Sequence, residues 1–286
     1  MTINNISEYI NVLSKIDNKQ LFFRGHSDET YKLKPNLYRK ENFYINEDNI
    51  YKETIVNSPQ EFYKCKKAIE VLVKMQHYGI PTRLLDITRN PLVALYFACC
   101  ENDNVNGEVI LLNIPIKSVR FYDSDKVTIL ANIAKQKVDF GFDFNDDIDY
   151  INNDDVAEIN NTYFGYLLHS IKEDKPHFYD IINPKDIEGV FAVQVKLDNP
   201  RIIKQNGAFL IFGIQKSDEG MSGKTNCAEI NAEWILRPNS ESVIVPKEAK
   251  KNILTELDLL GINNSTLFPE LEDYAKYIKD KYNYNK

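Results

Sequence analysis

The segment that most constrains this chain is residues 76–98, which read QHYGIPTRLLDITRNPLVALYFA. Gly79 and Pro81 end the helix that precedes them, because both residues break a regular helical backbone. Asn90 followed by Pro91 is typical of a helix N-cap and its first turn. A plain connection between two helices needs fewer residues than the polar stretch between these signals. The segment therefore predicts two helices joined by a tight polar turn that belongs to a functional site.

The composition narrows the class of protein. The chain has 286 residues, of which 43% are hydrophobic, enough for one large domain or two small ones. Its net charge of −7 argues against a broad nucleic-acid-binding surface, although a local basic site for phosphate is compatible with it. No apolar run reaches membrane-spanning length, and the first residues lack a signal-peptide pattern. We therefore expect a cytoplasmic protein without a membrane partner.

The four cysteines lack metal-ligand spacing, so we expect core thiols and no metal site. The sequence also contains no Walker A, GxGxxG, HExxH or GxSxG motif. Metal-dependent hydrolysis and the common serine-nucleophile classes therefore have no local signature here.

Hydrophobic periodicity predicts helices and strands in both halves of the chain. Helices are expected at residues 1–20, 59–77, 91–100, 246–261 and 271–278. Strands are expected at residues 21–23, 107–115, 189–197, 207–214 and 241–245. Strands framed by helices at both ends, with neighbouring strands late in the chain, favour an α+β fold over a doubly wound α/β fold.

The middle of the chain has a different composition. Residues 138–171 contain no Lys or Arg, and carboxylates gather between 139 and 158. The simplest interpretation is a solvated insertion at about 139–160. The alternative is a surface that docks a basic partner or mimics nucleic acid. The spacing of a calcium-binding EF-hand loop is absent.

Arg24 is the first candidate for ligand binding. It follows the apolar strand at 21–23, and a guanidinium at a strand end suits a bidentate contact to phosphate or carboxylate. Gly25 permits close approach of a ligand or of another backbone. The alternative for Arg24 is a structural ion pair. His77 and Tyr78, at the end of the predicted helix 59–77, could contact a ligand, or His77 could satisfy the last helical carbonyls.

Two further groups of candidates lie at element boundaries. Thr82 and Thr88 flank the polar turn, in which Arg83 and Asp86 are three residues apart and are expected to hydrogen-bond to each other. Gln205 precedes a predicted turn and strand, where its amide could reach a ligand or satisfy the turn backbone. Rigid scaffolds present functional side chains at such boundaries. We therefore expect Arg24, Arg83, Asp86 and Gln205 to line one cleft.

Four ordered blocks of the sequence resemble the FRG domain family, named for its Phe-Arg-Gly motif. The blocks are residues 23–25, 76–98, 201–209 and 260–271. Ile87 stands where the family usually has tryptophan. The resemblance covers nearly the whole chain and implies a single FRG-like domain over residues 1–286. Within it, residues 139–160 form the acidic insertion and residues 246–282 a helical C-terminal portion.

The order of these blocks is similar to that of ADP-ribosyltransferases. The resemblance implies an antiparallel or mixed sheet core flanked by N- and C-terminal helices, with NAD as the substrate. It implies catalytic roles for Arg24, Gln205 and Glu233. It implies nucleotide binding by Arg24, Gly25, His77, Tyr78, Thr82, Arg83, Asp86 and Thr88. Gln205 stands where glutamate is usual, and an amide cannot supply negative charge, so Glu229 or Glu233 is expected to supply it.

These implications lead to an expected function. The chain is expected to be a bacterial toxin or anti-phage defence effector, with ADP-ribosyltransferase or NAD glycohydrolase activity. Its expected partners are a nucleotide ligand and a protein target or regulator. One alternative is a non-catalytic nucleotide- or protein-sensing module of a defence system. Another is a scaffold whose acidic insertion docks a basic partner. The inference from fold to activity is an analogy.

Overall fold

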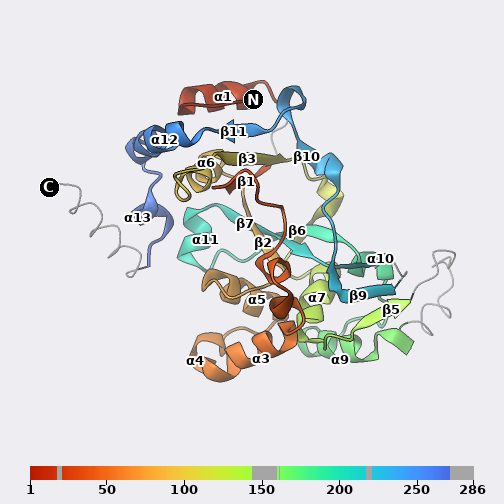
Figure 1. The fold of residues 1–286 in the computed structure, drawn as a ribbon. Coiled ribbons are helices and arrows are strands. Elements are labelled where there is room, and N and C mark those ends of the chain that lie inside the picture. Colours follow the sequence, from red (N-terminus) through yellow and green to blue (C-terminus); the bar gives the residue numbers. More distant parts are fainter. Residues whose placement is uncertain (18–20, 144–159, 161, 217–220, 271–286) are drawn as a thin grey trace.

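Figure 1 shows the computed structural model, which describes residues 1–286 except 18–20, 144–159, 161, 217–220 and 271–286. The described helices are α1 (Ile6–Ser14), α2 (Glu41–Tyr44), α3 (Glu47–Asn57), α4 (Pro59–Phe62), α5 (Ala68–His77), α6 (Pro91–Cys99), α7 (Asp125–Asn132), α9 (Gly165–Asp174), α10 (Pro184–Ile187), α11 (Pro200–Lys204), α12 (Lys247–Leu259) and α13 (Asn264–Leu267). The described strands are β1 (Phe22–His26), β2 (Leu84–Thr88), β3 (Gly107–Leu112), β4 (Val119–Phe121), β5 (Gly141–Asp143), β6 (Val190–Gln194), β7 (Gly207–Phe212), β8 (Ile214–Lys216), β9 (Met221–Cys227), β10 (Ile235–Leu236) and β11 (Val243–Val245). The fold is α+β, as the sequence predicts.

The main sheet has eight strands and is mostly antiparallel. Its order is β10-β3-β1-β2-β7-β6-β4, with β11 also paired to β3, and only β4 and β6 pair in parallel. A smaller sheet has the order β5-β9-β8. The two central strands meet at one register position, Phe23 opposite Thr88, whereas β2 pairs with β7 along five positions. The sheet is therefore weakly joined at its middle, between β1 and β2.

The helices on one face of the sheet follow this division. One apolar core joins β1 and β3 to α1, α6 and α12, and includes Phe23 and Leu111. A second core joins β2, β6 and β7 to α5, α7 and α9, and includes Leu84 and Ile211. Figure 1 shows these two groups of helices at opposite ends of the molecule. On this face, the β1–β2 junction thus lies between two halves that have separate apolar cores.

The opposite face carries a third core. Side chains alternate along a strand, so Phe22, Arg24 and His26 point to this face while Phe23 points to the other. The connection from β1 to α2 covers part of it through Leu37 and Tyr38, both in the short 3-10 helix η1 (Asn36–Arg39). Arg24 therefore lies at the border of an apolar layer.

Local signals explain the helix that follows the polar segment. The Asn90 side chain accepts a hydrogen bond from the Leu92 backbone N–H at 3.0 Å, and Pro91 is the first residue of α6. Gly261 has a φ of 75° just beyond α12, a left-handed conformation that glycine adopts readily. Both helix signals were correctly predicted from the sequence.

Two expectations about the fold are wrong. The polar turn contains the central strand β2, because Leu85 and Ile87 lie in the third core and Leu84 in the second. The single helix expected at 59–77 is divided into α4 and α5. The division is stabilised by Asp174, whose carboxylate accepts a hydrogen bond from the Ala68 backbone N–H at the start of α5, at 2.7 Å. Most of the acidic insertion and the helix expected at 271–278 lie outside the described residues.

Candidate functional site

Arg24 spans the β1–β2 junction. Its side chain leaves β1 and donates a hydrogen bond from Nη1 to the backbone oxygen of Asp86 in β2, at 2.5 Å. Partial burial lowers the pKa of Arg24 to about 10, an effect that Asp86 opposes and Arg39 reinforces. Arg24 therefore keeps its positive charge at neutral pH at the point where the sheet is weakly joined.

His26 holds the Arg24 side chain from the same strand. The Arg24 Nε donates to His26 Nε2 at 3.0 Å, and His26 is 2% exposed. Burial and the charges of Arg24 and Arg39 lower the pKa of His26 to about 3, so the ring is neutral at physiological pH. A neutral ring whose Nε2 accepts a hydrogen bond carries its proton on Nδ1. His26 is therefore a neutral acceptor that orients a cation, a role the sequence pattern alone did not assign.

Asp86 supplies a carboxylate on the other side of the junction. Its side chain is exposed, and Oδ2 accepts a hydrogen bond from Gln76 Nε2 at 2.7 Å. The buried Thr82 hydroxyl donates to Gln76 Oε1 at 2.6 Å and accepts from the Leu84 backbone N–H at 3.1 Å. A chain of hydrogen bonds thus fixes the orientation of Asp86. We call Arg24, His26, Gln76, Thr82 and Asp86 the junction site.

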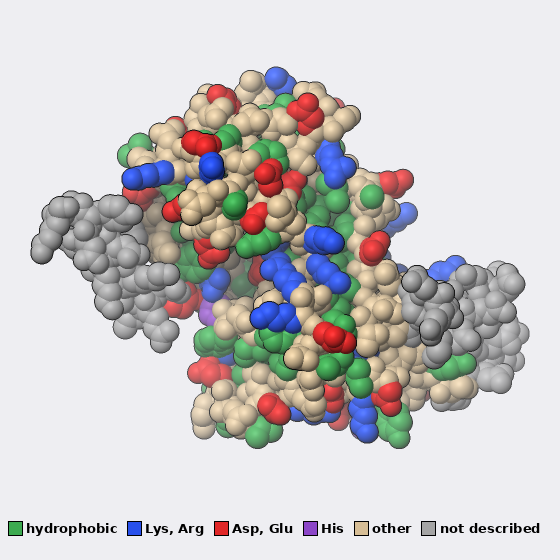
Figure 2. All heavy atoms as spheres, viewed as in Figure 1, with side chains coloured by type: hydrophobic (Ala, Val, Ile, Leu, Met, Phe, Trp, Pro, Cys, Tyr) green, Lys and Arg blue, Asp and Glu red, His purple; other side chains and the backbone are tan. Residues whose placement is uncertain are grey.

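Two further arginines lie near the junction site. Arg39, at the end of η1, is close enough to Arg24 to lower the pKa of that guanidinium. The Arg89 guanidinium carbon lies 5.1 Å from the ring centroid of Phe22, which shares a strand face with Arg24. Figure 2 shows Lys and Arg side chains gathered near the middle of the molecule, over the connection from β1 to α2. Local positive charge of this kind suits an anionic ligand despite the negative charge of the chain.

Arg83 does not pair with Asp86, and this expectation is wrong. Its side chain is fully buried, and its Nε and Nη2 donate to the two carboxylate oxygens of Glu47 at 2.8 and 2.6 Å. Nη1 donates to the Phe212 backbone oxygen at 2.8 Å. Burial opposes the charge, but Glu47 outweighs it and raises the pKa of Arg83 above its ordinary value. Arg83 belongs to the interior of the fold and does not line a cleft with Arg24.

Gly25 is required by a helix and faces no ligand. A Cβ at this position would lie 2.0 Å from the Ala94 backbone oxygen and 2.6 Å from the Ala98 nitrogen, both in α6. The close approach expected for Gly25 is therefore that of another backbone. The glycine of the Phe-Arg-Gly motif lets α6 pack against β1.

Thr88 and Gln205 meet at the end of β2, away from Asp86. The Thr88 hydroxyl donates to the Gln205 backbone oxygen at 2.6 Å. The Gln205 amide donates to the Leu267 backbone oxygen at 3.2 Å, which joins the region around α11 to the end of α13. These contacts correspond to the backbone-satisfying alternative for Gln205.

The residues around His77 join three of the sequence blocks. The Arg201 Nη1 donates to the His77 backbone oxygen at 3.3 Å, and its guanidinium carbon lies 4.5 Å from the ring centroid of Phe268. The His77 Nε2 lies 3.2 Å from Glu270 Oε1. Phe268 also contacts Phe97 of α6, with ring centroids 6.1 Å apart. The C-terminal block therefore bridges α5, α6 and α11, which belong to different halves of the structure.

The remaining candidates are placed apart from Arg24. Tyr78 is exposed and donates to Glu61 at 3.3 Å, and both His77 and Tyr78 line a cavity of about 850 Å³ that contains no residue of the junction site. Glu233 is exposed in the 3-10 helix η4 (Ala232–Trp234), and Glu229 is exposed in the chain before it. In the described part of the chain, neither carboxylate forms a hydrogen bond or ion pair with the junction site.

Within the described ranges, no group of three or more His, Cys, Asp or Glu side chains is arranged to hold a metal ion. No helix in that same part of the chain is both long and apolar enough to cross a membrane. Three of the four cysteines, Cys99, Cys100 and Cys227, have pKa values that burial raises to about 12, which makes them poor nucleophiles. Chemistry at the described sites rests on arginine, carboxylate and amide groups.

Sequence reasoning does not identify some partners of the candidate residues. Glu47 is 36 positions from Arg83 and lies outside every recognisable motif, so no local pattern marks the pair. Gln76 opens the block at residues 76–98, and its position there is the signal that could have found it. Arg39 has no local pattern, and only the covering of the sheet face by η1 places it near Arg24.

Comparison with known proteins gives one match. Residues 19–107 match the family model of the FRG domain. No curated protein and no solved structure matches the chain. The matched segment contains all five residues of the junction site, together with Arg39, Glu47, Arg83 and Arg89, and excludes Gln205 and Glu233. The comparison therefore identifies an FRG domain at residues 19–107 of this chain.

Proposed function

We propose that the junction site binds a phosphate-bearing nucleotide of the NAD type, with Arg24 as the phosphate ligand. The observation that carries this proposal is the position of Arg24 across the weakly joined strands β1 and β2. A guanidinium held by His26 loses little freedom on binding, and it can form charge-assisted hydrogen bonds to phosphate. Arg39 and Arg89 add positive charge on the same side. The matched FRG segment contains all of these residues.

The proposed activity is that of an ADP-ribosyltransferase-like effector. In this reaction the bond between the nicotinamide nitrogen and ribose C1′ breaks, and nicotinamide leaves with the bonding electrons. A target side chain, or water, then bonds to C1′ and releases a proton. Positive charge develops on the ribose during bond cleavage, and a fixed carboxylate stabilises it.

Asp86 fits the carboxylate role better than Gln205 or Glu233. Asp86 is exposed, lies close enough to Arg24 to favour its charged form, and is oriented by Gln76, whereas the Gln205 amide is bonded to the Leu267 backbone. We therefore assign transition-state stabilisation to Asp86. A bacterial toxin or anti-phage defence protein acting in the cytoplasm on a protein target is the biological setting that the family resemblance implies.

The activity is tested by incubating the protein with NAD labelled in the adenylate part, with and without cell lysate. Label transfer to a lysate protein supports a transferase, and release of nicotinamide without transfer supports an NAD glycohydrolase. Asp86→Asn should lower the rate about 100-fold while changing NAD affinity little, since the carboxylate acts in the transition state. Arg237→Ala, at an exposed arginine remote in sequence from the matched segment, is the control.

A second function is a non-catalytic nucleotide sensor. The observation that favours it is the engagement of Gln205 at the position where ADP-ribosyltransferases have a catalytic glutamate. Under this function NAD binds and Arg24→Ala removes binding, yet neither label transfer nor nicotinamide release occurs with any lysate. Binding without turnover would thus replace the first function by the second.

A further inference from the structure

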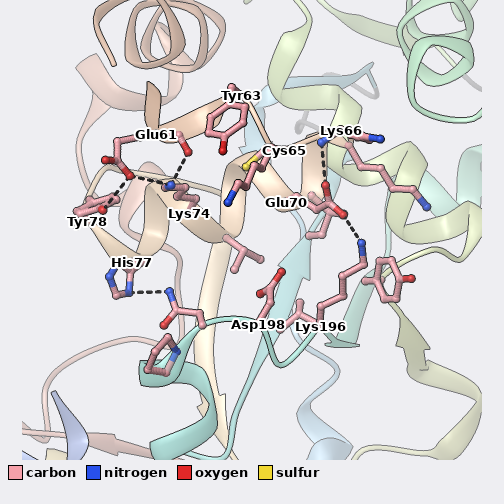
Figure 3. Close-up of a pocket in the computed structure, with 18 of the residues that line it drawn as sticks. Glu61, Tyr63, Cys65, Lys66, Glu70, Lys74, His77, Tyr78, Lys196 and Asp198 are labelled. Carbon is pink, nitrogen blue, oxygen red and sulfur yellow. Dashed lines mark hydrogen bonds and ion pairs between the residues drawn. The ribbon is translucent and has the colours of Figure 1, made fainter. Parts of the chain in front are cut away.

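The cavity of about 850 Å³ that His77 and Tyr78 line lies between the connection from α4 to α5, the helix α5 and the chain after β6. Figure 3 shows Glu61, Lys74 and Tyr78 on one side of this cavity and Lys66, Glu70 and Lys196 on the other. None of Arg24, His26 and Asp86 lines it. We call this cavity the lysine pocket. Its volume lies in the range of small-molecule sites, about 300–1,000 Å³.

Only some lysines of the pocket form ion pairs with carboxylates in the described part of the chain. Lysines outnumber carboxylates in the lining five to three, in a chain whose net charge is −7. Lys74 pairs with Glu61 at 2.8 Å, and Lys196 pairs with Glu70 at 2.7 Å. The other three lysines are Lys64, Lys66 and Lys67. Across the described part of the chain, no carboxylate lies within salt-bridge distance of these three ammonium groups.

Part of the pocket wall is apolar. Ile69, Val73 and Val195 line it and belong to, or pack against, the second core. The ring of Tyr122 stands at the same wall, with the Lys67 Nζ 5.2 Å and the Lys196 Nζ 4.8 Å from its centroid. An apolar wall beside free ammonium groups suits a ligand that has an uncharged ring body and an anionic end.

We propose that the lysine pocket binds a nucleoside polyphosphate, with the phosphates at Lys64, Lys66 and Lys67 and the base against Ile69, Val73 and Val195. The pocket is separate from the junction site, so this inference does not depend on the activity proposed above. Since His77 and Tyr78 line the pocket and Gln76 orients Asp86, the segment 76–78 connects the two sites along the chain. The pocket is therefore a second nucleotide site of the same chain.

Calorimetry with ATP and with inorganic pyrophosphate tests this assignment on the full chain. The Arg24→Ala protein is used beside the wild type, because ATP bound to it cannot depend on the Arg24 guanidinium. In that background, adding Lys66→Ala and Lys67→Ala should weaken ATP binding at least ~10-fold, through loss of two charge-assisted contacts. Adding Lys117→Ala and Lys251→Ala, which remove the same charge at exposed positions elsewhere, should change affinity less than ~2-fold. Thermal unfolding checks that each variant is folded.

Cys65 reports where the ligand binds. It lines the pocket and is partly exposed, whereas Cys99 and Cys227 are buried. ATP should slow maleimide labelling of Cys65, measured by peptide mass spectrometry, and should leave the labelling of Cys100 unchanged. Absence of ATP binding to the Arg24→Ala protein, or unchanged Cys65 labelling at saturation, would overturn the inference. Equal affinity for ATP and pyrophosphate would overturn the placement of the base.

The outcome is separable from that of the proposed function. If the junction site binds no nucleotide, wild type and Arg24→Ala bind ATP equally and Cys65 is still protected. If the lysine pocket binds none, Cys65 stays reactive even where wild-type protein binds NAD.

Discussion

At the scale of single residues, His26 links the junction site to the stability of the fold. Its buried ring faces the charges of Arg24, Arg39 and Asp28, and burial with the two arginines lowers its pKa to about 3 from an ordinary 6.5. The unfolded chain therefore binds the extra proton below pH 6.5, while the folded chain does not. The stability that His26 contributes is complete above pH 6.5 and falls by ~1.4 kcal/mol per pH unit between about pH 6.5 and pH 3.

Urea unfolding at pH 7.0 and pH 5.0 measures this effect. Between these values the wild-type protein should lose ~2 kcal/mol more than His26→Gln, which has no titrating ring. Equal losses for the two proteins would show that His26 is not held neutral in the fold.

The pair Arg83–Glu47 gives a second prediction at this scale. Glu47→Ala should lower the free energy of unfolding by ~3–5 kcal/mol, because it leaves Arg83 and Lys224 buried without a carboxylate. Asp86→Ala should cost less than ~1 kcal/mol, since Asp86 is exposed. Denaturant melts of both variants at neutral pH check the contrast. Similar losses of stability in the two variants would contradict the assignment of Arg83–Glu47 as the buried structural ion pair.

At the scale of elements, the packing of α6 on β1 depends on Gly25. Gly25→Ala should lower the free energy of unfolding by ~3 kcal/mol or more. The added methyl group would clash with backbone atoms of α6, which cannot move without displacing the helix. Gly165→Ala, at the start of α9 where a Cβ meets nothing within 4 Å, should be neutral within ~0.5 kcal/mol. Thermal unfolding of the pair of variants tests this, and a stable, wild-type-like Gly25→Ala protein would contradict it.

Among the helices and strands, the sequence predicts those whose signals are local. The N-cap at Asn90 and the C-terminal signal at Gly261 act within a few residues, so they were read correctly. Strand β2 was missed, because it is short and lies between two strong helix boundary signals, and it becomes a strand only through its pairing with β7. The division at residues 63–67 likewise depends on Asp174, which is 106 positions from Ala68.

The residues of the candidate site also divide into those that the sequence predicts and those that it does not. Arg24 was identified from its place beside an apolar strand, and Asp86 from the polar segment that contains it. Their partners His26 and Gln76 become visible only when two strands and a helix are brought together. Arg83 was misassigned, since a neighbour three residues away is visible in a sequence and a carboxylate 36 residues away is not.

At the scale of the whole molecule, two packed halves meet at β1 and β2, and a C-terminal block bridges them. Arg201 over Phe268, together with the bond from Gln205 to Leu267, connects α11 to α13 beside α6. Through Phe97 and Phe268, this block contacts the segment at residues 19–107 that matches the FRG domain. These contacts stabilise the relative position of the halves that carry Arg24 and Asp86.

The central claim is that Arg24 at the junction site contacts a phosphate of the ligand. Calorimetry with ADP-ribose, which has the diphosphate of NAD but no nicotinamide to be cleaved, tests it directly. The account predicts that Arg24→Ala lowers affinity ~10–100-fold, as expected for loss of a charge-assisted contact, and that exposed Arg39→Ala lowers it less. Arg237→Ala should bind like the wild type. Wild-type affinity in a folded Arg24→Ala protein would contradict the account.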